Sequence, residues 1–171
     1  MNKFLLVFGC LFIISVVGAE PLREPGQGES PALKPRSLVL PDMSGQNRNL
    51  DDWQGKVIIL NFWATWCRPC QIEIPDLMRY QSAYAEHNLQ VIGVGVDEPE
   101  KLKNYIRTVG INYPVLYANP EDQFNLLKQW GNSFGVLPYT VVIDKEGRLV
   151  YMQTGLFREA AFLKFVKPYL N

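Results

Sequence analysis

The fold is decided by residues Val57 to Pro75, which read V-I-I-L-N-F-W-A-T-W-C-R-P-C-Q-I-E-I-P. The first seven residues are apolar except for Asn61, with almost no alternation of apolar and polar side chains. Such a run is expected of a strand that is buried on both faces of a sheet. After a short connection, apolar residues recur at helical spacing as far as Tyr80. The sequence therefore places Cys67 and Cys70 where a buried central strand ends and a helix begins.

The start of a helix favours a thiolate on Cys67. The first N–H groups of a helix have no partner within it and carry partial positive charge, which stabilises a nearby anion. Cys67 is thus the predicted nucleophile, and Arg68 adds a nearby cation. Cys70 lies about one turn further along the same face, so it is the predicted resolving thiol that attacks a mixed disulfide on Cys67. Pro69 suits the first helical turn, because its missing N–H is not needed there.

Two alternatives to a redox pair follow from the same C-x-x-C spacing. A zinc site would need two more ligands. The chain offers only His87 and Cys10, and Cys10 falls in a segment predicted below to be removed, so four Cys and His ligands cannot come from one mature chain. A purely structural disulfide is the second alternative. A loop that encloses only Arg68 and Pro69 removes little entropy from the unfolded chain, so the pair would stabilise the fold poorly.

The N-terminal region is predicted to lie outside the folded domain. Residues 1–19 contain Lys3, an apolar run and the small-residue end Val17-Gly18-Ala19, a pattern typical of a secretory signal peptide. Since the apolar run is short for a spanning helix, an uncleaved N-terminal membrane anchor is the alternative. Residues 20–36 are rich in Pro, Gly and Glu and have no apolar periodicity, which predicts a flexible linker. The domain then comprises residues 37–171.

Cysteine content and charge narrow the class of function. Loss of residues 1–19 would leave Cys67 and Cys70 as the only cysteines. A lone C-x-x-C pair in an exported protein is explained more readily by redox exchange than by structure. The 171 residues include 17 Lys and Arg and 17 Asp and Glu, and a net charge near zero argues against nucleic acid as a partner. The predicted chemistry uses only sulfur atoms, so no metal or other cofactor is expected.

Strands and helices alternate along the rest of the chain. The predicted elements are a strand at Ser37–Pro41, a helical turn at Leu50–Lys56, a helix at Cys67–His87 kinked at Pro75, a strand at Gln90–Val96, a helix at Asp97–Val109, a strand at Tyr113–Tyr117, a helix at Asn119–Trp130, strands at Val136–Asp144 and Arg148–Met152, and a C-terminal helix. The core-facing residues predicted for the third and last helices are Phe124, Leu127 and Trp130, and Phe162, Leu163 and Val166. This order predicts an α/β fold with a mixed central β-sheet flanked by helices.

The combination resembles the thioredoxin fold, and within it the TlpA/ResA-like exported thiol–disulfide oxidoreductases. The resemblance covers about Leu38 to Tyr169. It rests on N-F-W-A-T-W-C-R-P-C at Asn61–Cys70, on Glu73-Ile74-Pro75, and on G-V-L-P-Y-T at Gly135–Thr140. It implies a thioredoxin-like sandwich with an N-terminal extension and an inserted βα unit.

The resemblance also implies roles for three residues around the cysteines. Pro138 would be cis and lie beside the cysteine pair, offering no N–H of its own at the sulfurs. The backbone of Leu137 would then pair with an extended substrate. Trp66 would flank the site as an apolar platform for a polypeptide. The alternatives are an ordinary turn proline, a core leucine and a core tryptophan.

One position departs from thioredoxins proper, which carry a buried Asp on the central strand six residues before the first cysteine. This chain has Asn61 there, so the proton acceptor for the resolving thiol must come from elsewhere. Glu73 corresponds to the acidic residue that TlpA/ResA-like proteins place near the site. Burial would raise the pKa of its carboxyl into a useful range. The alternative is a solvated glutamate on the helix surface.

The function implied by the resemblance is reduction of disulfides in exported polypeptides, in the periplasm, by a protein that is soluble or tethered by its N-terminal segment. The substrates implied are the haem-binding cysteines of apocytochrome c or another dedicated client. Electrons would come from a membrane thiol donor. The main enzymatic alternative is a dithiol oxidase or isomerase, because Arg68 stabilises the Cys67 thiolate and a stabilised reduced form makes a protein more oxidising.

Two further alternatives use the same scaffold. A non-enzymatic copper chaperone is one, since thiolates suit Cu(I). His87, however, lies in the wrong region to complete such a site. A peroxidase of the peroxiredoxin type is the other, but its single reactive cysteine lacks a nearby partner, whereas Cys67 has Cys70.

Overall fold

A computed structural model describes residues 37–170 of the chain. The predicted signal peptide or anchor at 1–19 and the predicted linker at 20–36 lie outside the described residues. So does Asn171. None of the helices between residues 37 and 170 is both long enough and apolar enough to cross a membrane.

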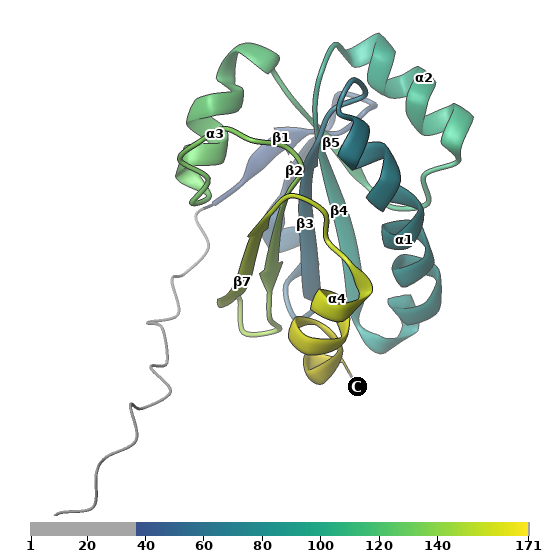
Figure 1. Cartoon of the computed structure of the whole chain (residues 1–171), viewed down its shortest axis with the longest axis vertical. Helices are drawn as coiled ribbons and strands as arrows, with labels where there is room; N and C mark the ends of the chain where they lie inside the picture. The colour runs from purple at the N-terminus through teal and green to yellow at the C-terminus, as the bar shows by residue number, and fades with distance from the viewer. Residues whose placement is uncertain (1–36, 171) are drawn as a thin grey trace, which may run out of the picture.

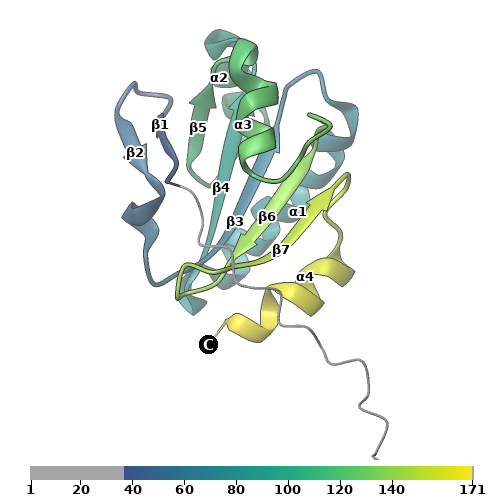
Figure 2. The ribbon, with the colours of Figure 1, turned by 90° about the vertical axis from the view of Figure 1, so that its left-hand side faces the viewer.

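A five-stranded mixed sheet is built around β3 (Val57–Trp63), with the strand order β5-β4-β3-β6-β7 (Figure 2). β3 runs parallel to β4 (Leu89–Val96) and antiparallel to β6 (Tyr139–Ile143). β5 (Val115–Ala118) pairs parallel with β4, and β7 (Leu149–Thr154) pairs antiparallel with β6. Every residue of β3 is buried, which confirms the prediction of a central strand covered on both faces.

Helices cover both faces of the sheet (Figure 1). One face packs against α1 (Arg68–Tyr84), α2 (Pro99–Val109) and α4 (Glu159–Phe165). The opposite face packs against the short α3 (Gln123–Gln129) and against the N-terminal region. The predicted mixed sheet flanked by helices is confirmed.

The N-terminal region adds a small sheet of its own. β1 (Val39–Pro41) and β2 (Asn47–Asn49) pair antiparallel and lead into a 3-10 turn at Leu50–Trp53. Leu50 and Trp53 are buried in the same apolar layer as α3. The other 3-10 turns are at Ala85–His87, Pro120–Asp122 and Lys167–Tyr169.

The predictions for the two short helices are wrong in one residue each. Phe124 of α3 is 52% exposed and Leu163 of α4 is 47% exposed, although both were expected to face the core. Each helix has only seven residues and buries one side chain, which is Leu127 in α3 and Phe162 in α4. Two helical turns are too short for an apolar period to identify the buried face.

Close packing between β4 and its neighbours depends on glycines that face the α1 side of the sheet. A Cβ atom at Gly95 would lie 2.6 Å from Cδ2 of Leu102, and one at Gly93 would lie 2.9 Å from Nε1 of Trp63. Leu102 and Trp63 are fully buried and have little room to move. Glycine at these two positions therefore permits the close approach of the neighbouring side chains.

Gly95→Ala is expected to lower the free energy of unfolding by about 1–3 kcal/mol, because the new methyl group overlaps the Leu102 side chain. Urea denaturation of the oxidised protein measures the change. Leu102→Ala removes the overlapping atoms, so Gly95→Ala should cost less in that background. Equal costs in the two backgrounds would contradict the steric explanation.

Candidate active site

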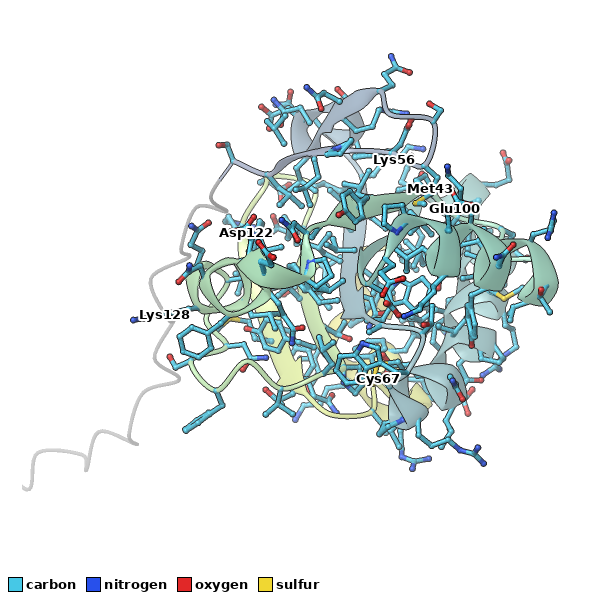
Figure 3. The ribbon with its side chains drawn as sticks, turned by 90° about the horizontal axis from the view of Figure 1, so that it is seen from above. Met43, Lys56, Cys67, Glu100, Asp122 and Lys128 are labelled. Carbon is cyan, nitrogen blue, oxygen red and sulfur yellow. A yellow bond between two sulfur atoms is a disulfide. The ribbon has the colours of Figure 1, made fainter. Side chains whose placement is uncertain are left out.

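Cys67 and Cys70 form a disulfide, with their Cα atoms 5.3 Å apart. Cys67 is the N-cap residue of α1, and its Sγ accepts a hydrogen bond from the N–H of Cys70 at 3.3 Å. Figure 3 shows Cys67 beside the first turn of this helix. Cys67 is 4% exposed and Cys70 is completely buried, so only Cys67 can be reached from outside. The two predicted cysteines are therefore brought together in the predicted place, where β3 ends and α1 begins.

Side chains from two other positions fix the connection between β3 and α1. Asp97, which follows β4 and is 4% exposed, accepts hydrogen bonds from the N–H of Thr65 at 3.2 Å and from the Thr65 hydroxyl. Gln71 donates to the C=O of Thr65 at 2.7 Å. The adjacent Trp66 is 64% exposed and is not a core residue. Sequence reasoning missed Asp97 and Gln71; the available signal was an acidic residue directly after the strand next to β3.

Glu73 is 1% exposed and lies on α1, one turn beyond Cys70. Its Oε1 accepts a hydrogen bond from Nδ2 of Asn61 at 2.7 Å, and its Oε2 accepts one from the N–H of Phe157 at 2.7 Å. Nδ2 of Asn61 also donates to Oγ1 of Thr140 at 3.0 Å. Asn61 and Thr140 are opposite each other in the β3–β6 register. The Glu73 carboxyl is thus buried and accepts a hydrogen bond at each oxygen, so Glu73 is not a solvated glutamate on the helix surface.

Burial raises the pKa of Glu73 from 4.5 to about 7. Loss of solvation is the largest cause, and the charge of Asp76 acts in the same direction. The hydrogen bonds from Phe157 and Asn61 favour the carboxylate but do not offset the burial. A carboxyl group that titrates near neutral pH can take up and return a proton during a reaction cycle. The raised pKa agrees with the expectation from the sequence.

The peptide bond between Leu137 and Pro138 is cis. Tyr139 begins β6 and stands opposite Phe62 in the antiparallel register, so Pro138 lies level with the end of β3 that leads to the cysteines. The C=O of Pro138 accepts a hydrogen bond from the N–H of Gly155 at 2.8 Å. Leu137 is half-buried, and within residues 37–170 its N–H and C=O form no hydrogen bond. The structure therefore places the predicted proline and a free backbone edge at the end of the sheet that carries the disulfide.

His87, the one histidine weighed as a metal ligand, is exposed in the 3-10 turn that follows α1. It therefore lies at the opposite end of that helix from the cysteines. Among the described residues, no three His, Cys, Asp or Glu side chains come together as potential metal ligands.

Sequence comparisons show which family the chain belongs to. The family model described as AhpC/TSA matches residues 34–152. The thiol-disulfide oxidoreductase ResA of Geobacillus thermodenitrificans is 33% identical over 135 residues, which cover 77% of this chain and 75% of that protein. ResA of Bacillus subtilis is 29% identical over 136 residues, with coverage of 77% and 73%.

Solved structures share the fold. A thiol:disulfide interchange protein of the thioredoxin family from Chlorobium tepidum TLS is 32% identical with a TM-score of 0.68, over 79% of this chain and 94% of that one. A secreted thiol-disulfide isomerase from Corynebacterium glutamicum is 25% identical with a TM-score of 0.71, over 78% and 83%. These likenesses confirm the thioredoxin-like sandwich. Together with the C-x-x-C disulfide at the start of α1, they show that the chain belongs to the AhpC/TSA family of thioredoxin-fold proteins and is a thiol–disulfide oxidoreductase related to ResA.

Proposed function

We propose that this protein reduces disulfide bonds in exported polypeptides, with Cys67 as the nucleophile and Cys70 as the resolving thiol. In the reduced protein the Cys67 thiolate attacks the client disulfide, so a mixed disulfide forms and one client thiolate leaves. Cys70 then attacks the sulfur of Cys67, the second client thiolate leaves, and the Cys67–Cys70 disulfide forms. The client gains two electrons and the protein loses two.

The observation that carries this proposal is the buried carboxyl of Glu73 one turn from Cys70. Cys70 is itself fully buried and must lose its proton before it can attack Cys67. A carboxyl with a pKa of about 7 suits the acceptor of that proton. Asn61 and the N–H of Phe157 donate hydrogen bonds to this carboxyl and fix its position.

The client would lie along the segment that contains Leu137 and Pro138. The free N–H and C=O of Leu137 suit an extended polypeptide, which binds by adding strand-like hydrogen bonds. Trp66, 64% exposed and next to Cys67, would supply an apolar platform for the same client. Pro138 has no backbone N–H, so it offers no competing hydrogen-bond donor to the sulfurs.

Two charges near the thiols have opposite effects on the redox potential, and the one that favours reduction of the client is the stronger. The cation of Arg68 stabilises a thiolate, whereas an ionised Glu73 destabilises one. Arg68 is exposed and its field is screened by solvent, but Glu73 is buried and is screened much less. Destabilising the reduced form makes a dithiol a stronger reductant.

The cellular setting is proposed from the N-terminal sequence and from the resemblance. Residues 1–19 would direct the chain to the periplasm or remain as an anchor. Each cycle leaves the cysteines oxidised, so a membrane thiol donor would return two electrons. Apocytochrome c is the proposed client by resemblance to TlpA/ResA-like proteins, in which case the protein acts in cytochrome c biogenesis.

Replacing Cys70 by Ala should convert transient mixed disulfides into stable adducts on Cys67, because no resolving thiol remains. The adducts can be isolated from cells and identified by mass spectrometry, which also names the client. Cys67→Ala is the matched control and should trap nothing, since Cys70 is fully buried. Equal trapping by the two variants would contradict the assignment of the nucleophile.

Glu73→Gln should change both the stability and the rate as functions of pH. The native protein holds the Glu73 proton up to about pH 7, whereas the unfolded chain releases it near 4.5. Glu73 therefore stabilises the fold below about pH 4.5, and this contribution falls by up to about 3 kcal/mol as pH rises to about 7. Urea denaturation of oxidised wild type and Glu73→Gln across this interval should give a difference that varies with pH.

The exchange rate of the same variant tests the proton acceptor. Glu73→Gln should slow the resolving step about 10²-fold and remove the inflection near pH 7. Glu86→Gln, at an exposed position after α1, is the control and should keep the wild-type profile. An unchanged profile in Glu73→Gln would exclude Glu73 from the mechanism.

The redox potential distinguishes the reductase from a dithiol oxidase or isomerase; the Corynebacterium glutamicum neighbour is named an isomerase. Equilibration with glutathione should give a potential below about −200 mV for a reductase. A value well above that would favour the oxidase or isomerase. Arg68→Gln should lower the potential further, because it removes the cation that favours the Cys67 thiolate.

A further inference from the structure

Exposed aromatic and aliphatic side chains gather beside the segment that contains Leu137 and Pro138. Phe134 is 87% exposed, Val136 is 47% exposed, and Phe124 of α3 is 52% exposed. The ring of Phe124 lies over Gly135, where a Cβ atom would be 3.0 Å from its Cδ2. We call Phe124, Phe134 and Val136 the apolar patch. Large apolar side chains held together in solvent are typical of an interaction surface.

The loop that carries the patch is held by buried and half-buried polar side chains. Asn132 is 3% exposed; its Nδ2 donates to the C=O of Val136 at 2.7 Å, and its Oδ1 accepts the N–H of Phe134 at 3.3 Å. Gln123 donates to the C=O of Gly135 at 3.1 Å. These bonds leave the side chains of Phe134 and Val136 pointing away from the core. A preorganised surface of this kind loses little conformational entropy when a partner binds.

The chemistry of the patch selects an apolar partner. From Gln129 to Ile143 the sequence contains no Asp, Glu, Lys, Arg or His. The nearest preceding charge, Lys128, points outward from α3 and away from Cys67 (Figure 3). The loop that contributes Phe134 and Val136 therefore offers no charge to an acidic or basic recognition segment; the charge nearest in sequence to Phe124 is that of Asp122. The apolar patch can bury an apolar side chain, and exposed aromatic residues are the usual anchors for such contacts.

The patch is continuous with the place where the proposed function puts the client. Val136 is adjacent to Leu137, whose N–H and C=O are free to pair with an extended chain. A client whose cysteine reaches Cys67 and whose backbone pairs with Leu137 would continue toward Val136 and Phe134. We propose that the apolar patch binds a large apolar side chain of the client, located a few residues from its reactive cysteine. This inference rests on the proposed function and names the class of client.

Kinetics with Phe134→Ser test the inference, because Phe134 is 87% exposed and its loss should leave the fold intact. The substrates are two peptides, each joined by a disulfide to a reporter thiol, that differ only in having Leu or Ser near the cysteine. Wild type should show a KM about tenfold lower for the Leu peptide, the scale of one buried apolar side chain. Phe134→Ser should abolish that preference, with kcat and the rate toward oxidised glutathione unchanged.

Matched variants complete the experiment. Phe124→Ser should reduce the preference in the same direction, whereas Leu163→Ser, a 47% exposed leucine on α4, should leave it intact. Equal KM values for the two peptides in wild type would overturn the inference while leaving disulfide reduction in place. Failure of wild type to reduce either peptide would instead overturn the proposed function. A wild-type dimer that Phe134→Ser converts to a monomer, with no change in KM, would assign the patch to self-association and overturn client docking.

Discussion

The functional end of the molecule depends on one buried carboxyl group, that of Glu73. A carboxyl group without solvent requires hydrogen-bond donors, and these come from the Asn61 amide on β3 and from the N–H of Phe157 before α4. The two bonds tie α1 to the sheet and to the connection that follows β7, so they fix where the first turns of α1 lie. They also explain the departure at position 61. An aspartate there would face Glu73 with a second acid, and the two would compete for one proton.

Rigidity around the disulfide comes from side chains that bind backbone. Asp97 and Gln71 bind Thr65 in the connection between β3 and α1. Asn132 binds the backbone of the loop before the cis-proline. These polar groups are paired with loop backbone. Trp66, which follows Thr65, and Phe134, whose N–H binds Asn132, are exposed to solvent. The site thus combines hydrogen-bonded polar side chains, which hold the loops, with apolar side chains that are exposed to solvent.

Patterns within single segments of the sequence predicted the central strand and the start of the helix that follows it. An apolar run interrupted only by Asn61 identified β3, and the positions of Cys67 and Glu73 at the start of the next helix followed from spacing alone. β2 was not predicted, because Asn-Arg-Asn has low strand propensity and pairs only with β1. Asp97 and Asn132 were missed because their roles depend on which segments lie side by side. The register of β3 with β4 and β6 decides that, and periodicity within one element does not contain it.

The small exposure of Cys67 has a consequence for how such an enzyme chooses substrates. A sulfur atom in a residue only 4% exposed makes few contacts of its own, so sulfur chemistry supplies reactivity but little affinity. A client must be held by neighbouring groups while its own disulfide is brought in line with Cys67. In the proposed client site, the backbone of Leu137 would bind any extended chain, because main-chain hydrogen bonds do not distinguish sequences. Selectivity would therefore come from side-chain contacts beside that backbone, where Phe134 and Val136 present apolar groups in a loop that carries no charge.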